Sequence, residues 1–106
     1  MVGMKIYISG PITGTNIETT RARFEAAEEM LRGQGFTPVN PMKNGLPVDA
    51  PYEEHMKRDL ELLAECDAIY LMNGWERSKG CRMEFNAAIS ANKRITYERE
   101  NGKRFV

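Results

Sequence analysis

The chain has 106 residues, 42% of them hydrophobic and 28% charged, and its 15 basic residues balance 15 acidic ones. These values are ordinary for one globular domain, and a net charge of zero without a basic stripe argues against binding to a nucleic-acid polymer and favours a small-molecule ligand. Cys66, Cys81 and His55 lack the spacing of a metal site, and no apolar run is long enough for a signal peptide or a membrane span, so we expect a cytoplasmic protein with free thiols and no metal.

The first half of the chain predicts two strands on either side of a helix. Residues 4–9 form a short apolar run that ends at Gly10-Pro11, which is typical of a buried strand followed by a turn. Apolar residues recur at helical spacing from Asn16 to about Arg32, and two glycines end this helix. Residues 36–40 form a brief second strand, and Pro38 within it indicates an edge position.

The second half continues the alternation of helices and strands. A long loop rich in proline and glycine, residues 41–51, leads into a helix from Pro51 to about Glu65, with the proline in its first turn. Residues 67–72 are nearly all apolar, which is typical of a central strand in a parallel sheet. After a loop at 73–77, Ser78 is the expected N-cap of a third helix that runs to about Asn92.

The C-terminal residues predict a fourth strand and a hairpin. Residues 94–98 alternate as a strand, Asn101-Gly102 is a strong turn signal, and residues 103–106 would return antiparallel. The order of elements predicts one α/β domain over residues 1–106, a flavodoxin-like, three-layer, doubly wound sheet with four parallel strands in the order 2-1-3-4 and an antiparallel C-terminal strand. In such sheets the ligand binds beyond the carboxyl ends of the strands. The loops at those ends are 10–15, 40–50 and 73–77.

A glutamate projects from the small-residue face of the third predicted helix. At about 100° per residue, Glu84 falls in the middle of a stripe of small side chains that should pack tightly on the sheet. Gly80, one turn earlier, leaves the space beside Glu84 open, because helical side chains lean toward the N-terminus. Glu84 should therefore be partly buried, near the strand ends where the ligand crevice is expected. The stripe consists of Gly80, Cys81, Ala87, Ala88 and Ala91.

The second predicted helix repeats this anomaly, because Asp59 falls within its apolar face rather than among its many charged residues. A buried carboxylate is unfavourable unless it is paired or hydrogen-bonded. Either Asp59 or Glu84 alone could be structural, capping a loop or pairing with a buried arginine. Two such carboxylates on facing helices near the predicted crevice favour a functional pair.

Other candidate binding residues surround the predicted crevice. The glycine turn after the first strand could cradle a phosphate or be only a turn, and its spacing is neither the dinucleotide nor the Walker pattern. Ser78 could bind a phosphate or serve only as an N-cap. Trp75 could stack on a base or only cover its loop, and Tyr7 could belong to the core or to the pocket wall. The candidates are Tyr7 and Ser9 on the first strand, Gly10, Pro11 and Ile12 in the turn, and Gly74, Trp75, Ser78 and Gly80 after the third strand.

Four segments of the chain resemble the nucleoside 2-deoxyribosyltransferase superfamily, including its nucleoside 5′-monophosphate N-glycosidase branch. Residues 5–11 are similar to the family's first strand and glycine turn, and residues 58–60 and 66–69 are similar to the segment with an active-site aspartate. Residues 78–84 are similar to the stretch that ends in the nucleophilic glutamate. The resemblance spans residues 4–97 and is closest to a branch found in bacteria and phages.

The resemblance implies a retaining reaction at the anomeric carbon of a nucleoside or nucleotide, without a cofactor. Glu84 would attack C1′ and form a covalent glycosyl ester, which a second nucleobase or water would then cleave. Asp59 would position Glu84 or the sugar hydroxyls or assist proton transfer to the base, and Tyr7 would orient the glutamate or line the pocket. Ser78 is typical of the branch that binds a 5′-phosphate. A homodimer or larger homo-oligomer is also implied, because family sites borrow residues from a neighbouring subunit.

Two other functions fit the same sequence. The chain could be a non-catalytic module that binds or senses a nucleotide, a hypothesis that the altered residues around Glu84 keep open. It could also bind a flavin, which rests on fold analogy alone. The presence of Tyr7, Asp59 and Glu84 together favours the enzyme.

Overall fold

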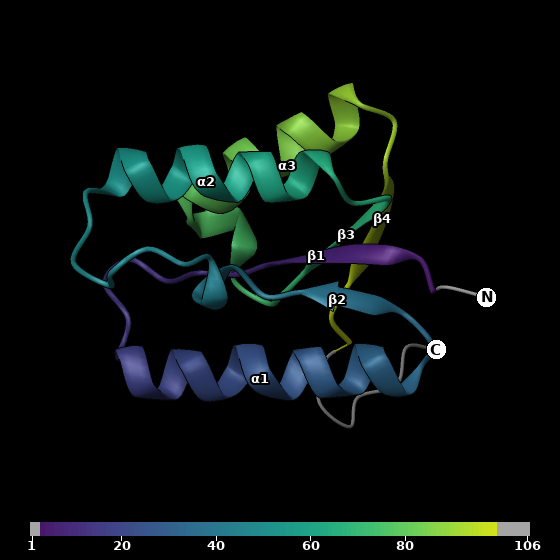
Figure 1. Ribbon diagram of the computed structural model, residues 1–106, viewed down its shortest axis with the longest axis horizontal. Helices are drawn as coiled ribbons and strands as arrows, with labels where there is room; N and C mark the ends of the chain where they lie inside the picture. The colour runs from purple at the N-terminus through teal and green to yellow at the C-terminus, as the bar shows by residue number, and fades with distance from the viewer. Residues whose placement is uncertain (1–2, 100–106) are drawn as a thin grey trace.

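The computed structural model describes residues 3–99 and contains a parallel sheet with helices on both faces (Figure 1). The strands lie in the order β2-β1-β3-β4, and each neighbouring pair is parallel, so the predicted order 2-1-3-4 is confirmed. The predicted hairpin at Asn101-Gly102 and the antiparallel strand at 103–106 lie outside the described residues. The strands are β1 (Lys5–Ser9), β2 (Thr37–Val39), β3 (Ala68–Leu71) and β4 (Arg94–Tyr97).

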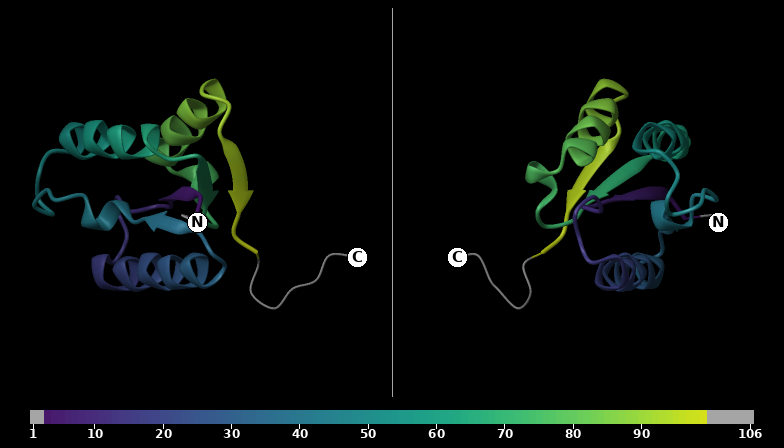
Figure 2. Two further views of the ribbon diagram at one scale, coloured as in Figure 1. Left: turned by 45° about the vertical axis from the view of Figure 1, so that its right-hand side comes forward. Right: turned by 90° about the vertical axis from the view of Figure 1, so that its left-hand side faces the viewer.

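The three helices form two layers around the sheet. Helix α1 (Ile17–Gly33) covers one face, and α2 (Tyr52–Ala64) and α3 (Lys79–Ser90) cover the other (Figure 2). Asn16 caps α1 by accepting a hydrogen bond from the Thr19 amide at 3.0 Å, because the first amides of a helix lack partners within it. In the described part of the chain, no helix is long and apolar enough to cross a membrane.

Two of the three loops expected on the ligand side contain a short 3-10 helix. The first, η1 (Pro41–Lys43), follows Asn40, whose side-chain oxygen accepts a hydrogen bond from the Met42 amide at 2.9 Å. The second, η2 (Trp75–Arg77), follows Gly74, which has a positive φ of 92° that glycine adopts without strain. A single turn is too short to leave a hydrophobic period in the sequence, which is why only loops were predicted at these positions.

Alternation along β1 sends its side chains to two separate cores. Ile6 and Ile8 pack with Phe24 and other side chains on the α1 face. Tyr7 belongs to the opposite cluster, beneath α2 and α3, together with Leu63 and others. Successive strand residues point to opposite faces, so Ser9 faces the same way as Tyr7. The strand therefore presents two hydroxyl groups to the layer that carries Asp59 and Glu84.

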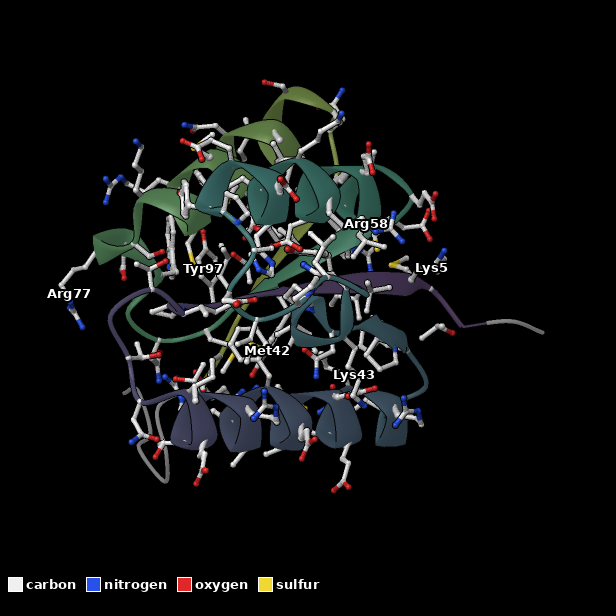
Figure 3. The ribbon with its side chains drawn as sticks, turned by 60° about the vertical axis from the view of Figure 1, so that its left-hand side comes forward. Lys5, Met42, Lys43, Arg58, Arg77 and Tyr97 are labelled. Atoms are coloured by element: carbon white, nitrogen blue, oxygen red, sulfur yellow. The ribbon has the colours of Figure 1, made fainter. Side chains whose placement is uncertain are left out.

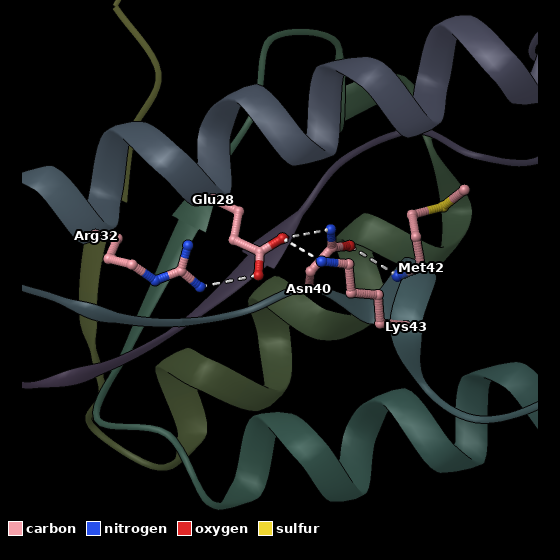
Figure 4. Close-up of polar contacts among 5 residues, drawn as sticks. All are labelled: Glu28, Arg32, Asn40, Met42 and Lys43. Carbon is pink, nitrogen blue, oxygen red and sulfur yellow. Dashed lines mark hydrogen bonds and ion pairs between the residues drawn. The ribbon is translucent and has the colours of Figure 1, made fainter.

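A buried charge network connects α1 to η1 (Figure 4). Glu28 is 8% exposed, and its Oε1 accepts hydrogen bonds from Asn40 Nδ2 and Lys43 Nζ, both at 3.1 Å. Its Oε2 pairs with Arg32 at 3.1 Å. Burial raises the pKa of Glu28, but these hydrogen bonds outweigh burial and leave the pKa below its usual value. The network, which the sequence did not indicate, fixes the start of the loop between β2 and α2.

Candidate active site

A cavity of about 480 Å³ is lined by the segments that follow β1, β2 and β3. Strands β2 and β3 lie on opposite sides of β1, so the cavity lies at the switch in strand order, where this class of fold binds ligands. Its volume is in the range of small-molecule sites, about 300–1,000 Å³. Of the three predicted loops, the first two line the cavity, whereas the third contributes only through Ser78 and the start of α3 that follow it.

The cavity has an apolar wall and a small number of polar groups. Its polar lining includes the two carboxylates of Asp59 and Glu84, together with a single arginine, Arg21 of α1. Such a combination suits a flat or apolar ligand that is oriented by a few polar contacts. The apolar wall consists mainly of Ile12, Ile17, Met42, Leu46, Val48 and Met56.

Two hydroxyl groups of β1 hold Glu84 in place. The Glu84 side chain is on α3 and is 6% exposed. Its Oε2 accepts a hydrogen bond from Tyr7 Oη at 2.7 Å, and its Oε1 accepts one from Ser9 Oγ at 2.6 Å. Each carboxylate oxygen keeps a second lone pair, because each accepts only one of these bonds. The partly buried position that the sequence predicted for Glu84 is confirmed, and its catalytic role stays a prediction.

The surroundings of Glu84 bring its titration to neutral pH. Burial raises the pKa of Glu84 to about 7, with a further contribution from the negative charge of Asp59, and the hydrogen bonds from Ser9 and Tyr7 oppose this rise. Burial and the adjacent carboxylates of Glu84 and Asp59 raise the pKa of Tyr7 well above its ordinary value. Tyr7 therefore stays protonated and remains a hydrogen-bond donor to Glu84.

Asp59 is held by a loop residue that the sequence did not indicate. Asp59 is 6% exposed on α2, and its Oδ1 accepts a hydrogen bond from Asn44 Nδ2 at 2.9 Å. Burial raises the pKa of Asp59, while the Asn44 hydrogen bond and the nearby His55 and Arg58 oppose the rise. Asn44 itself is 6% exposed and lies just after η1, so the charge network around Glu28 also fixes its position.

Comparison with known proteins places the chain in a family. The family described as "Domain of unknown function (DUF4406)" matches residues 4–97. The chain belongs to the DUF4406 family. No curated protein matches the sequence of this DUF4406 chain significantly.

Among solved structures, a 2-desoxiribosyltransferase from Leishmania mexicana is similar to this DUF4406 chain, with a TM-score of 0.68 and 19% sequence identity. The match covers 89% of this chain and 63% of the other, so this chain spans less than two thirds of the transferase's length. The likeness confirms the 2-deoxyribosyltransferase-like, flavodoxin-like fold that the sequence resemblance implied.

Several of the predicted binding residues lie at the cavity. Gly10, Ile12, Ser78 and Gly80 line it, and Ser9 reaches it through its bond to Glu84. Ser78 caps α3, its Oγ accepting a hydrogen bond from the Cys81 amide at 3.2 Å, as expected of the N-cap. Its hydroxyl hydrogen remains for another acceptor.

Two glycines of the cavity wall, Gly10 and Gly80, differ in how much room their neighbours leave for a side chain. A Cβ on Gly10 would lie 2.9 Å from Met72 Sδ and 3.2 Å from Phe24 Cζ, so the β1 turn approaches the core too closely for a side chain. A Cβ on Gly80 would lie 3.1 Å from Met56 Sδ and 3.3 Å from Tyr52 Oη. The cavity is lined by both Gly80 and Glu84, in agreement with the open space predicted beside Glu84, although the ends of two α2 side chains lie close to Gly80.

Besides Ser9, three predicted binding residues, Pro11, Gly74 and Trp75, are not part of the cavity lining. Trp75 packs on Phe85 and Tyr97, with ring centroids 4.7 Å and 6.3 Å away, and it belongs to the core cluster beneath α3. Gly74 approaches Pro11, whose Cγ is 3.3 Å from the position of a Cβ on Gly74. The loop around Trp75 therefore covers the sheet, and Arg77 at its end points away from the molecule (Figure 3).

His55 was not predicted to be part of the site. The side chain is partly buried and lines the cavity, one helical turn before Asp59 on the same face of α2. That spacing of four residues was the available signal. Within residues 3–99, no group of three or more His, Cys, Asp or Glu side chains is arranged to hold a metal ion.

Proposed function

We propose that the protein cleaves the N-glycosidic bond of a nucleoside or nucleoside 5′-monophosphate and transfers the 2-deoxyribosyl group to a second base or to water. The observation that carries the proposal is the buried Glu84 carboxylate, held by the hydroxyls of Tyr7 and Ser9 in a cavity of small-molecule size. The fold likeness to a 2-desoxiribosyltransferase and the resemblance of residues 78–84 support it.

In the proposed reaction, Glu84 is the nucleophile. One carboxylate oxygen attacks C1′, the N-glycosidic bond breaks, and the base leaves with the bonding electron pair and takes up a proton. The glycosyl ester formed on Glu84 is then cleaved by a second base or by water, with overall retention of configuration. Tyr7 and Ser9 fix the direction of the carboxylate, and its pKa of about 7 leaves a large ionised fraction at neutral pH.

Asp59 and Ser78 support the binding of the sugar and its phosphate. Asn44 occupies Oδ1 of Asp59, and no group in residues 3–99 forms a hydrogen bond with Oδ2. Oδ2 is thus available to accept a hydrogen bond from a sugar hydroxyl or to pass a proton to the base. Ser78 at the N-terminus of α3 and Arg21 of α1 offer a hydroxyl and a positive charge for a 5′-phosphate.

The test is release of free base. The protein would be incubated with a panel of nucleosides and 5′-monophosphates, with and without an acceptor base, beside Glu84→Ala and the control Glu25→Gln on an exposed part of α1. We expect release by the wild type and the control, and a loss of about a thousandfold or more in Glu84→Ala. Intact mass measurement of quenched reactions should show one 2-deoxyribosyl group added to the wild type.

A folded wild type that releases no base from any member of the panel contradicts the proposal. In that case, binding of a nucleotide without turnover, measured by calorimetry, identifies the non-catalytic sensing module instead. If Glu84→Ala still releases base, the proposed reaction is supported, but Glu84 is excluded as its nucleophile.

A further inference from the structure

A single buried amide in the cavity wall is held by one face of α2. Asn44 contacts three residues within one turn of α2, because Arg58 and Asp59 follow His55 by three and four residues. Asn44 Nδ2 donates to Asp59 Oδ1 at 2.9 Å and lies 3.1 Å from His55 Nδ1. The Arg58 Nε donates to the Asn44 carbonyl oxygen at 3.2 Å. The loop between β2 and α2 is thus attached to the helix that carries Asp59.

The partners of Asn44 determine the direction of each hydrogen bond. Its Oδ1 accepts a hydrogen bond from the Leu46 amide at 3.0 Å, so both hydrogens of Nδ2 point to Asp59 and His55. His55 Nε2 lies 3.0 Å from the Pro47 carbonyl oxygen, which can only accept. Nε2 therefore carries a hydrogen and Nδ1 is the acceptor, which is the neutral Nε2–H tautomer of imidazole.

We propose that Asn44 and His55 are positioning residues for Asp59, and that they hold its carboxylate in place only while His55 is neutral. The proposal rests on the role proposed for Asp59 at the substrate. Asn44 fixes Oδ1 and leaves Oδ2 available to a ligand, and His55 fixes Asn44 by accepting its second amide hydrogen. Without the imidazole acceptor, that buried amide hydrogen would lack a partner.

Protonation of His55 reverses this arrangement. A hydrogen on Nδ1 would face the hydrogen that Asn44 Nδ2 directs at His55, so the bond would be replaced by a repulsive contact. The loop contact through Asn44 would weaken, and the imidazolium would attract Asp59 directly. The other charged and titratable groups that act on Asp59 are Arg58 on α2, Tyr7 on β1 and Glu84 on α3, whereas the loop contributes the neutral amide.

The first test uses nuclear magnetic resonance and needs no activity. The chain has one histidine, so the imidazole nitrogen resonances belong to His55 without further assignment. At alkaline pH the wild type should show the Nε2–H tautomer, and the Nδ1 resonance of Asn44→Ala should shift because that nitrogen loses its hydrogen-bond donor. A wild type with Nδ1–H, or an Nδ1 resonance that Asn44→Ala leaves unchanged, would overturn the proposal. This result is independent of whether the protein releases a base.

The second test compares two replacements of His55 in the base-release assay. His55→Asn places an amide oxygen near the Nδ1 position and keeps an acceptor for Asn44, whereas His55→Gln reaches toward Pro47 and does not. Above neutral pH, His55→Asn should be more active than His55→Gln by about tenfold, in kcat rather than in KM. Thermal unfolding establishes that both variants are folded.

The pH profile of kcat/KM separates positioning from a merely structural role. In the wild type, activity requires both the ionised Glu84 and the neutral form of His55, whereas in His55→Asn it requires only the ionised Glu84. The acidic limb should therefore have a steeper slope in the wild type than in His55→Asn. Equal activity of the two His55 variants, or an unchanged slope in His55→Asn, would overturn the proposal.

Discussion

Replacing Glu84 by glutamine should make the protein more stable at alkaline pH. The pKa of Glu84 rises from 4.5 to about 7 on burial, so between these values the folded state binds a proton that the unfolded chain does not. Stability therefore falls as pH rises through this window, and above about pH 7 the whole loss is present. The difference between the two pKa values corresponds to about 3 kcal/mol. Glutamine has no charge to bury and can still form hydrogen bonds with Tyr7 and Ser9.

The assay is urea unfolding at about pH 5 and about pH 8.5, followed by fluorescence. Trp75 is the only tryptophan in the sequence and packs on Phe85, so its emission reports the loss of tertiary structure. Between wild type and Glu84→Gln, the difference in the free energy of unfolding should grow toward about 3 kcal/mol at the higher pH. Glu25→Gln, an exposed control, should follow the wild type. Parallel pH curves for wild type and Glu84→Gln would refute the argument that burial destabilises the ionised carboxylate.

Two further predictions concern the donors to Glu84 and the glycines of the cavity. Tyr7→Phe removes a hydrogen bond to the ionised carboxylate, so the acidic limb of kcat/KM should move up by about one pH unit or more, whereas Tyr70→Phe, on the opposite face of the sheet, should leave it unchanged. If the acidic limb of kcat/KM does not move in Tyr7→Phe, the role of Tyr7 in stabilising the ionised Glu84 is contradicted. Gly10→Ala should lower the free energy of unfolding by about 1–3 kcal/mol, because its Cβ meets the core. Gly80→Ala should change it by less than about 1 kcal/mol, because flexible side-chain ends can move and alanine favours the helix. Urea unfolding compares the two, and equal losses would contradict the packing argument.

The parts of the fold that depend on local periodicity were predictable from the sequence. The apolar runs at 4–9 and 67–72 predicted the two inner strands, and Pro38 placed the second strand at an edge. Helical projection placed Asp59 and Glu84 inside, and both are 6% exposed. These predictions succeeded because each rests on a local property of the sequence. The strands follow from apolar runs, the edge position from the amide hydrogen that proline lacks, and the buried carboxylates from the angle between successive helical side chains.

The contacts that complete the site depend on residues far apart in sequence. Asn44 lies in a loop, and only the position of η1 beside α2 brings it to Asp59, 15 residues later. Trp75 was a candidate for base stacking, but Phe85 and Tyr97 offered it an apolar surface on the sheet. The periodicity of a sequence does not predict such tertiary contacts. The direction in which a loop side chain points can therefore be determined only when its neighbours in space are known.

The low stability of the ionised Glu84 and its proposed chemistry have the same physical origin. Burial and the negative charge of Asp59 raise the free energy of the free carboxylate. As Glu84 bonds to C1′, its charge disappears into an ester while positive charge develops on the sugar, so both effects become less unfavourable and Asp59 becomes attractive. The environment therefore favours the transition state over the free carboxylate, and Tyr7 and Ser9 keep enough of the ionised form for attack. For this reason, the gain in stability and the loss of base release should occur together in Glu84→Gln.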